Sequence, residues 1–227
     1  MKVLVGEDDA YIRNGLQELL EGEGYRTVQA ADGAASLVLF LRERPDFVLL
    51  DIMMPKRNGY DVCREIRRVD DAVPVIFISA KSEEIDRVIG LELGADDFIV
   101  KPFGTKEVIA RIRAVTRRCL RRTNASAPPS LDFGELTVYP AELRARRGDD
   151  CIELSLRDVK ILTLLHRERG KVVSRDSLFN ECWGRDYLPS SRTLDQQISK
   201  LRKAIEREPK VPEIIHTVHG VGYRYDG

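Results

Sequence analysis

Five residues that can do chemistry follow short apolar runs in the first half of the sequence. They are two neighbouring acids, a third acid, a hydroxyl and an ammonium group, namely Glu7, Asp8, Asp51, Ser79 and Lys101. Carboxylates a few Å apart repel one another by about 4 kcal/mol per pair at an effective dielectric constant near 20. A divalent cation among them removes that repulsion, and a set of oxygen ligands suits Mg²⁺, which also accepts phosphate as a ligand. The sequence therefore predicts a magnesium site.

Asp51 has the best position for a reactive group. It ends the apolar run 47–50, and Pro55 soon interrupts regular structure, so we expect Asp51 at the carboxyl end of a buried strand. Open α/β sheets bind their ligands at that edge. A carboxylate there can act as a nucleophile and form an acyl phosphate, which Lys101 and Ser79 could hold. Each of these residues alone is more common as a helix cap or turn residue, but their occurrence at successive strand ends favours the site.

The segments between these residues must bring them together. Short apolar runs alternate with segments whose apolar residues recur at helical spacing, five times in succession. This alternation predicts an α/β domain with a doubly wound sheet of five parallel strands, whose carboxyl ends meet at one edge. We expect strands near 3–5, 25–30, 47–50, 75–78 and 98–100, each followed by a helix.

Composition excludes several classes of protein. The chain has 227 residues, enough for two domains, and its 37 Lys and Arg residues balance 37 Asp and Glu residues, which excludes a uniformly basic protein that coats nucleic acid. Its four Cys residues have no CxxC spacing, so we expect reduced thiols. The sequence shows no signal peptide and no apolar run of about 20 residues, and we therefore predict a soluble cytoplasmic protein.

Residues 1 to about 118 resemble the receiver domain of two-component response regulators, from the acidic pair at 7–8 to the Lys-Pro-Phe run at 101–103. The resemblance implies a flavodoxin-like fold with Asp51 as phosphoacceptor, Ser79 as switch hydroxyl and Lys101, before a cis proline, as phosphoryl-binding lysine. Phe98 takes the place of a switch aromatic residue that is more often Tyr. The implied ligands of Mg²⁺ are Glu7, Asp8, Asp51 and the carbonyl of Met53.

The composition changes after Arg117. A run of arginines passes into Thr, Asn, Ser and Pro, and we place one domain at 1–120, a linker at 121–130 and a second domain at 131–227. The arginine run fits either a nucleic-acid patch or the cationic end of a helix. Strand-like pieces then precede two helices, an amphipathic helix near 190–206 and a hairpin with its tip at 219–222. That order predicts an α+β domain with a winged helix-turn-helix.

Charge alone decides little in the second half, because residues 131–227 hold 17 Lys and Arg against 16 Asp and Glu. The amphipathic helix is more informative. Between residues 190 and 207 it has a net charge of +3, from five basic and two acidic residues. Amides and cations on one helix face suit base edges and phosphates in a major groove.

This half resembles the winged-helix domain of OmpR/PhoB-type response regulators, with matching segments at 154–156, 183–187, 192–195, 198–203 and 217–224. The resemblance implies a recognition helix at about 190–206 and a wing at about 216–224 that enters the adjacent minor groove. Ser199 and His219 stand where relatives commonly carry Arg, so half-site preference does not transfer from them. The expected DNA-binding residues are Arg192, Thr193, Gln196, Gln197, Ser199, Lys200, Lys203, His219 and Arg224.

Two charged clusters of complementary sign lie near the end of the receiver segment. Their residues are Arg87, Glu92, Asp96, Asp97, Glu107, Arg111, Arg113 and Arg118. An ordinary solvated surface carries similar ion pairs, each worth about 0–1 kcal/mol. By resemblance, however, such faces pair across a two-fold axis, which repeats every contact. The expected pairs between subunits are Arg87–Glu107, Asp97–Arg111 and Glu92–Arg113.

We therefore predict a phosphorylation-controlled, DNA-binding transcriptional regulator and not an enzyme. A sensor histidine kinase would phosphorylate Asp51, a homodimer would form, and the dimer would bind double-stranded promoter DNA; RNA polymerase is a further candidate partner. One alternative is an aspartate-nucleophile phosphatase of the haloacid dehalogenase type, but that class needs a second Asp where Met53 stands. A constitutive DNA binder with a vestigial receiver is disfavoured by the complete acidic site.

Overall fold

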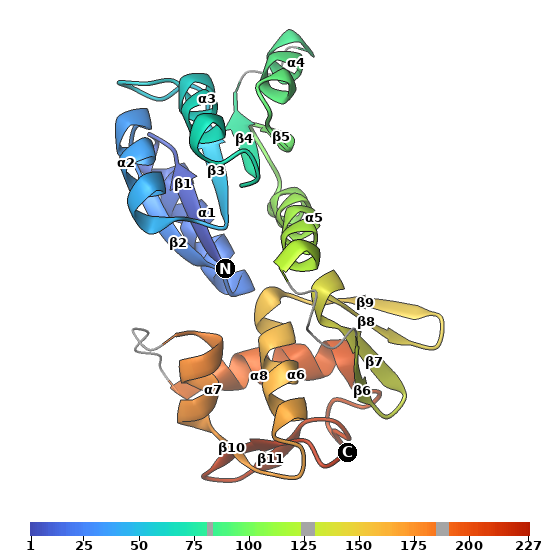
Figure 1. The fold of residues 1–227 in the computed structure, drawn as a ribbon. Helices are drawn as coiled ribbons and strands as arrows, with labels where there is room; N and C mark the ends of the chain where they lie inside the picture. Colours follow the sequence, from blue (N-terminus) through green and yellow to red (C-terminus); the bar gives the residue numbers. More distant parts are fainter. Residues whose placement is uncertain (81–83, 124–129, 185–190) are drawn as a thin grey trace. The chain divides into compact units, whose positions relative to one another are not determined.

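The computed structural model describes the chain except for residues 81–83, 124–129 and 185–190. The chain forms two compact units, Met1–Cys119 and Leu120–Gly227 (Figure 1). Within the described ranges, none of the helices combines the length and hydropathy that a membrane crossing needs.

The N-terminal unit is the predicted doubly wound α/β fold. Its five parallel strands lie in the order β2-β1-β3-β4-β5. The strands are β1 (Lys2–Gly6), β2 (Arg26–Ala30), β3 (Phe47–Asp51), β4 (Val75–Ser79) and β5 (Asp97–Val100). The helices are α1 (Ala10–Glu23), α2 (Gly33–Glu43), α3 (Gly59–Val69), α4 (Glu84–Glu92) and α5 (Thr105–Thr123). The arginine run thus lies in the last turns of α5, which continues into the segment predicted as linker.

Helices cover both faces of this sheet. On one face, Val48 and Leu50 of β3 pack in a cluster with Phe40 of α2 and Ile66 of α3. Successive residues of a strand point to opposite faces, so Leu49 faces the other side. There α1 and α5 lie side by side, joined by an ion pair between Glu23 and Arg113 at 2.8 Å and by a hydrogen bond between the hydroxyls of Tyr25 and Thr116 at 2.7 Å. Burial on both faces explains why the central strands are almost continuously apolar.

Two local features fix the loops at the carboxyl edge of the sheet. Asp9 is the N-cap of α1, and its carboxylate accepts hydrogen bonds from the backbone N–H groups of Tyr11 and Ile12 at 2.8 and 3.1 Å. Gly59 begins α3 against the carbonyl of Asp51, where a Cβ atom would clash. Any larger residue at 59 would therefore displace the segment that carries Asp51.

The C-terminal unit is the predicted α+β domain. An antiparallel sheet of four consecutive strands comes first, formed by β6 (Leu131–Phe133), β7 (Leu136–Tyr139), β8 (Arg144–Arg147) and β9 (Asp150–Glu153), with a 3₁₀ turn, η1 (Pro140–Glu142), between β7 and β8. Three helices follow, α6 (Leu156–Arg167), α7 (Arg175–Cys182) and α8 (Ser191–Ile205). A second sheet of order β10-β12-β11 joins β10 (Val173–Ser174) to the wing strands β11 (His216–Val218) and β12 (Gly222–Arg224).

The helix α8 is amphipathic, as the sequence predicts. Its apolar stripe, Leu194, Ile198, Leu201 and Ile205, is at most 1% exposed. A capping box begins α6: Ser155 Oγ accepts from the backbone N–H of Asp158 at 3.0 Å, and the Asp158 carboxylate accepts from the backbone N–H of Ser155 at 2.9 Å. The buried stripe leaves the polar side of α8 facing away from the core.

Candidate functional site

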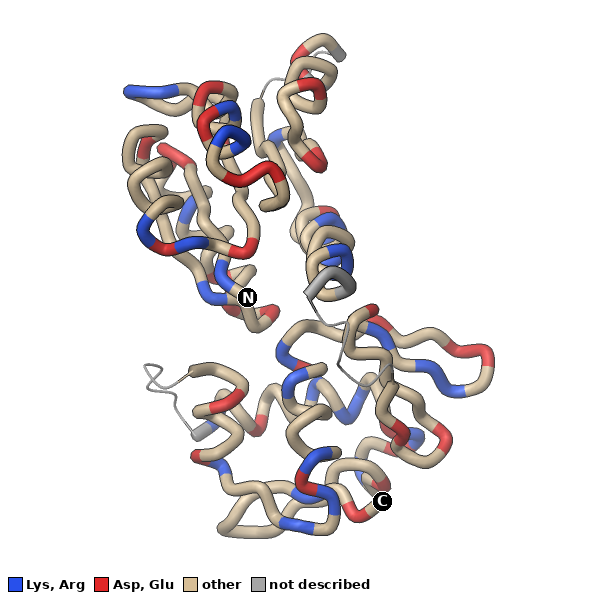
Figure 2. Tube along the Cα trace, in the orientation of Figure 1, with Lys and Arg blue, Asp and Glu red and all other residues tan. Residues whose placement is uncertain are grey.

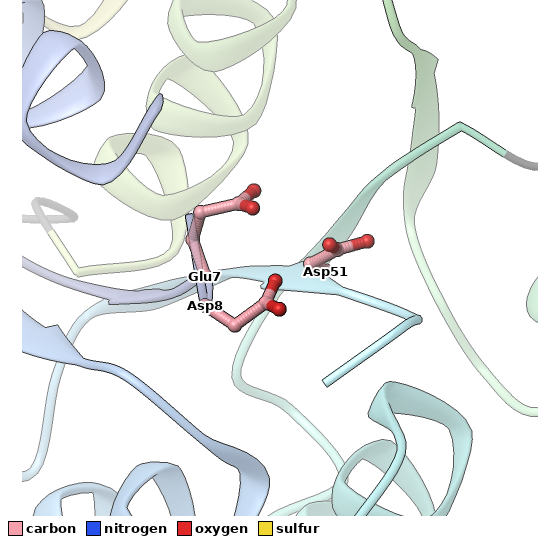
Figure 3. Close-up of side chains that lie close together, drawn as sticks. All are labelled: Glu7, Asp8 and Asp51. Atoms are coloured by element: carbon pink, nitrogen blue, oxygen red, sulfur yellow. The ribbon is translucent and has the colours of Figure 1, made fainter. Parts of the chain in front are cut away.

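The three predicted acids meet at the carboxyl edge of the parallel sheet. Glu7 and Asp8 follow β1, Asp51 ends β3, and ligand oxygens from all three lie within 4.8 Å of one another. Figure 3 shows the three side chains close together, with those of Asp8 and Asp51 directed toward a common space. Glu7 and Asp51 are buried, whereas Asp8 is exposed. The site is therefore open to solvent on the side of Asp8.

Lys101 joins this cluster from the end of β5. Its ammonium group contacts a carboxylate oxygen of Glu7 at 2.7 Å and Oδ2 of Asp51 at 3.0 Å. The peptide bond between Lys101 and Pro102 is cis, as the resemblance implied. One cation thus bridges two of the three acids.

Glu7 and Lys101 have shifted pKa values. Burial raises the pKa of Glu7 to about 7, although the hydrogen bond from Lys101 opposes that shift. Burial lowers the pKa of Lys101, but its hydrogen bonds to Glu7 and Asp51 outweigh this effect and raise the pKa above its ordinary value. The lysine therefore stays protonated and supplies a positive charge at neutral pH.

The remaining predicted receiver residues surround the cluster. Ser79 ends β4, the strand next to β3, and is fully buried. The backbone N–H of Met53 donates to Oδ1 of Asp51 at 3.3 Å, while the Met53 side chain is exposed. Phe98 is buried, with its ring 6.3 Å from that of Phe77. The structure thus places Ser79 and Met53 at the carboxyl edge of the sheet, whereas Phe98 lies inside β5, beside Phe77 of β4.

The donor set fits Mg²⁺. Three carboxylates provide hard oxygen ligands within the reach of one ion, and the exposed Asp8 leaves room for water and a phosphoryl group. Glu7, Asp8 and Asp51 would hold the ion. When bound, the metal would neutralise negative charge on the acids and on a transferring phosphoryl group.

Most predicted DNA-binding residues lie on the solvent side of α8. Basic positions mark this helix and α5 in Figure 2. The exposed side chains of α8 in this set are Arg192, Gln196, Ser199, Lys200 and Lys203, while Thr193 is partly buried. His219 is exposed at the tip of the wing, between β11 and β12.

Gln197 and Arg224, both predicted to bind DNA, have partners within the domain. Gln197 donates from Nε2 to Oδ1 of Asp158 in α6 at 2.7 Å, so its side chain points back toward the core and not into a groove. Arg224 forms an ion pair with Asp226 at 2.5 Å. The adjacent Gln196 is therefore the better candidate for a base contact, while a DNA contact of Gln197 would require the loss of its hydrogen bond to Asp158.

Several charged residues of the predicted dimer face already form ion pairs within their own chain. Arg111 contacts both Asp97 and Glu107 of its own chain, each at 2.9 Å. Arg113 pairs with Glu23 of α1, and both side chains are largely buried, so the predicted pairing of Arg113 with Glu92 of a partner would require this ion pair to open. Asp96 accepts from Arg67 at 3.3 Å and lies 3.6 Å from Arg118. Glu92 is exposed, and the side chain of Arg87 lies outside the described residues.

The sequence reasoning missed an apolar component of this face. Helical spacing predicts a helix here but not which of its apolar residues are buried, and several of them are exposed. They are Ile85, Val88, Ile89 and Leu91, with exposed fractions of 61, 45, 38 and 51%. Contiguous exposed apolar side chains commonly mark an interaction surface. The signal in the sequence for this exposed surface was that apolar residues, and no charged ones, occupy these four positions of α4.

Comparisons with known proteins cover both units. The family model "Response regulator receiver domain" matches residues 3–113, and "Transcriptional regulatory protein, C terminal" matches residues 148–225. The chain is 41% identical over 232 aligned residues to the alkaline phosphatase synthesis transcriptional regulatory protein SphR of Synechococcus elongatus, covering 98% of this chain and 90% of that protein. The Thermotoga maritima regulator DrrB, an OmpR/PhoB homologue, matches at 32% identity over 100% of this chain and 99% of its own, with a TM-score of 0.45. The receiver domain of the Francisella response regulator 1452 matches at 33% identity over 52% of this chain and 97% of its own, with a TM-score of 0.50.

Proposed function

Because the chain belongs to the OmpR/PhoB-type response regulators and is a two-component regulator of transcription, we propose that Asp51 is its phosphoacceptor and that phosphorylation controls its binding to DNA. The observation that carries this proposal is the convergence of Glu7, Asp8, Asp51 and Lys101 at one edge of the sheet. A sensor histidine kinase is the proposed donor. As a DNA-binding regulator the protein would act in the cytoplasm, and no turnover of a phosphate-ester substrate is expected of it.

The geometry supports a simple transfer step. A carboxylate oxygen of Asp51 attacks the phosphorus atom of the donor, a new P–O bond forms, and the bond to the donor's leaving group breaks with its electron pair. Lys101 lies 3.0 Å from Asp51, where its ammonium group can hold a phosphoryl oxygen. The hydroxyl of Ser79, at the end of the adjacent strand, can donate to another oxygen. The role of the residues around Asp51 is thus to position and neutralise the phosphoryl group.

A DNA-binding measurement tests this function directly. The full chain should select a duplex from a randomised pool and bind it more tightly after treatment with acetyl phosphate and Mg²⁺. Moving a two-state domain completely, from 1:99 to 99:1, needs about 5.5 kcal/mol of differential binding. We do not expect phosphorylation to cause such an all-or-none change, and therefore expect DNA affinity to increase by a few hundred-fold or less. Equal affinity with and without the phosphoryl donor would mean that the receiver does not control the DNA-binding domain.

The neighbouring glutamines of α8 provide a matched pair for the recognition surface. Gln196→Ala should reduce discrimination at one base pair by about 1–3 kcal/mol, because its exposed amide can contact a base edge. Gln197→Ala should leave base preference unchanged and lower the melting temperature, since it removes the hydrogen bond to Asp158. Base preference is measured by competition among duplexes with single substitutions. The reverse pattern, with preference altered only by Gln197→Ala, would show that the wrong side of α8 has been assigned to DNA.

We also propose a homodimer through α4, β5 and α5 of the receiver unit. The exposed apolar residues of α4 would supply buried area, and the ion-pair residues Asp97, Glu107 and Arg111 would surround it. A two-fold axis repeats each contact, so small favourable terms double. Because Arg111 already has partners in its own chain, its charge would add mainly to specificity and orientation.

A further inference from the structure

Asp195 lies on α8 between residues expected to contact DNA, yet its carboxylate is held within the domain. Its Oδ1 atom accepts a hydrogen bond from the hydroxyl of Tyr223 at 2.5 Å and another from Nη2 of Arg175 at 2.7 Å. Tyr223 belongs to the wing strand β12, and Arg175 is the first residue of α7. One carboxylate oxygen therefore joins the recognition helix, the preceding helix and the wing.

Tyr223 is fixed on several sides. Its side chain is buried, and the guanidinium groups of Arg175 and Arg202 lie 5.9 and 5.7 Å from the ring centre. Arg202 in turn donates to the carbonyl of Ile215 at 3.0 Å and to Oγ1 of Thr217 at 2.8 Å, at the other wing strand. The wing is thus bound to α8 through side chains of both its strands.

The backbone around Tyr223 is held in place by the neighbouring strands. Gly222 lies against the carbonyl of Val173 in β10, where a Cβ atom would clash. Tyr223 itself pairs with Val173 on one side and with Thr217 on the other. Burial raises the pKa of the Tyr223 hydroxyl, and the hydrogen bond to Asp195 adds to this effect, so the hydroxyl remains a proton donor at neutral pH. The contact to Asp195 is consequently present across the physiological pH range.

We propose that Asp195 and Tyr223 are positioning residues for DNA recognition, which set the angle between the recognition helix and the wing. This inference rests on the proposed function. A winged domain must present one element to the major groove and another to the neighbouring minor groove at the same time. A rigid connection raises the effective concentration of the second contact once the first has formed. Removing the hydroxyl of Tyr223 would leave both DNA-contacting surfaces intact but would loosen their relative placement.

The test uses Tyr223→Phe in the full chain and the duplex selected by the wild-type chain. This variant keeps the ring between Arg175 and Arg202 and loses only the hydroxyl. We expect affinity to fall about tenfold, as for a lost hydrogen bond to a charged group. At saturating protein, dimethyl sulfate should still find guanine N7 protected in the major groove, whereas protection of adenine N3 in the minor groove should be lost. Asp195→Asn, which keeps an acceptor oxygen but no charge, should show the same pattern more weakly.

Tyr139→Phe is the matched control, because it removes a hydroxyl from β7 in the other sheet of the same domain. It should leave affinity and both protections unchanged. Wild-type affinity and protection in Tyr223→Phe would overturn the proposal. So would an equal loss of both protections together with a lower melting temperature, which would indicate a purely structural role. If the wild-type chain selects no duplex, the proposed function itself fails, and the inference with it.

Discussion

Replacing Asp51 by Asn should abolish phosphorylation by acetyl phosphate. The amide has nearly the shape of the carboxylate but is a poor nucleophile, and it cannot form the acyl phosphate. It also removes one of the three charges that would hold Mg²⁺, so metal affinity should fall as well. Phosphate-affinity electrophoresis of the full chain, with and without the donor, measures the first effect, and a titration of the unphosphorylated protein with Mg²⁺ measures the second.

Asp9→Asn is the matched control for this experiment. Asp9 lies in the same acidic run but caps α1, and Asn caps helices equally well. Its substitution should therefore leave phosphorylation and metal binding unchanged. Undiminished phosphorylation of Asp51→Asn would show that another residue is the acceptor.

Reversing the charge of Arg111 should keep the phosphorylated protein monomeric. Arg111 lies between Asp97 and Glu107, so Arg111→Glu puts a third carboxylate on the proposed dimer face. A surface ion pair is worth about 0–1 kcal/mol, so a reversal that replaces attraction by repulsion at two symmetric contacts can cost up to about 4 kcal/mol, or roughly 1000-fold in dimer affinity. Phosphorylation of Asp51 should be unaffected. Sedimentation velocity of the phosphorylated variant measures the outcome.

Two further variants make the dimer experiment specific. Arg42→Glu reverses an exposed charge on α2, away from the proposed face, and should dimerise like the wild type. Adding Asp97→Arg to Arg111→Glu should restore dimerisation in part, because the exchanged charges can again pair. A dimer of wild-type strength in Arg111→Glu alone would exclude this face.

The receiver site was predictable because its residues occur where apolar runs end. A run such as 47–50 can only be a short buried strand, and parallel strands bring their carboxyl ends to one edge whatever the details of the connecting helices. The positions of Asp51, Ser79 and Lys101 then follow from chain order. Likewise, the apolar stripe of α8 determined which side of that helix is buried.

The residues whose intrachain partners the sequence did not reveal lie on helices, where sequence spacing gives the direction of a side chain but not its partner. Gln197 and Arg113 are both polar and look solvent-facing, yet each bonds to a side chain far away in the sequence, at separations of 39 and 90 residues. Such contacts depend on how neighbouring helices pack, which periodicity does not specify. The sequence likewise did not reveal that the apolar side of α4 is exposed, since an apolar stripe predicts burial without saying whether the covering surface belongs to the same chain.

The contacts of Lys101 with Glu7 and Asp51 affect how the folded receiver depends on the concentration of free magnesium. A cluster of acids without any counter-charge would strain the folded receiver whenever free magnesium was scarce. Here the lysine supplies that counter-charge from within the protein. On the proposed function, the fold of the unphosphorylated receiver would then depend little on the metal concentration, and magnesium would act mainly on the transfer of the phosphoryl group.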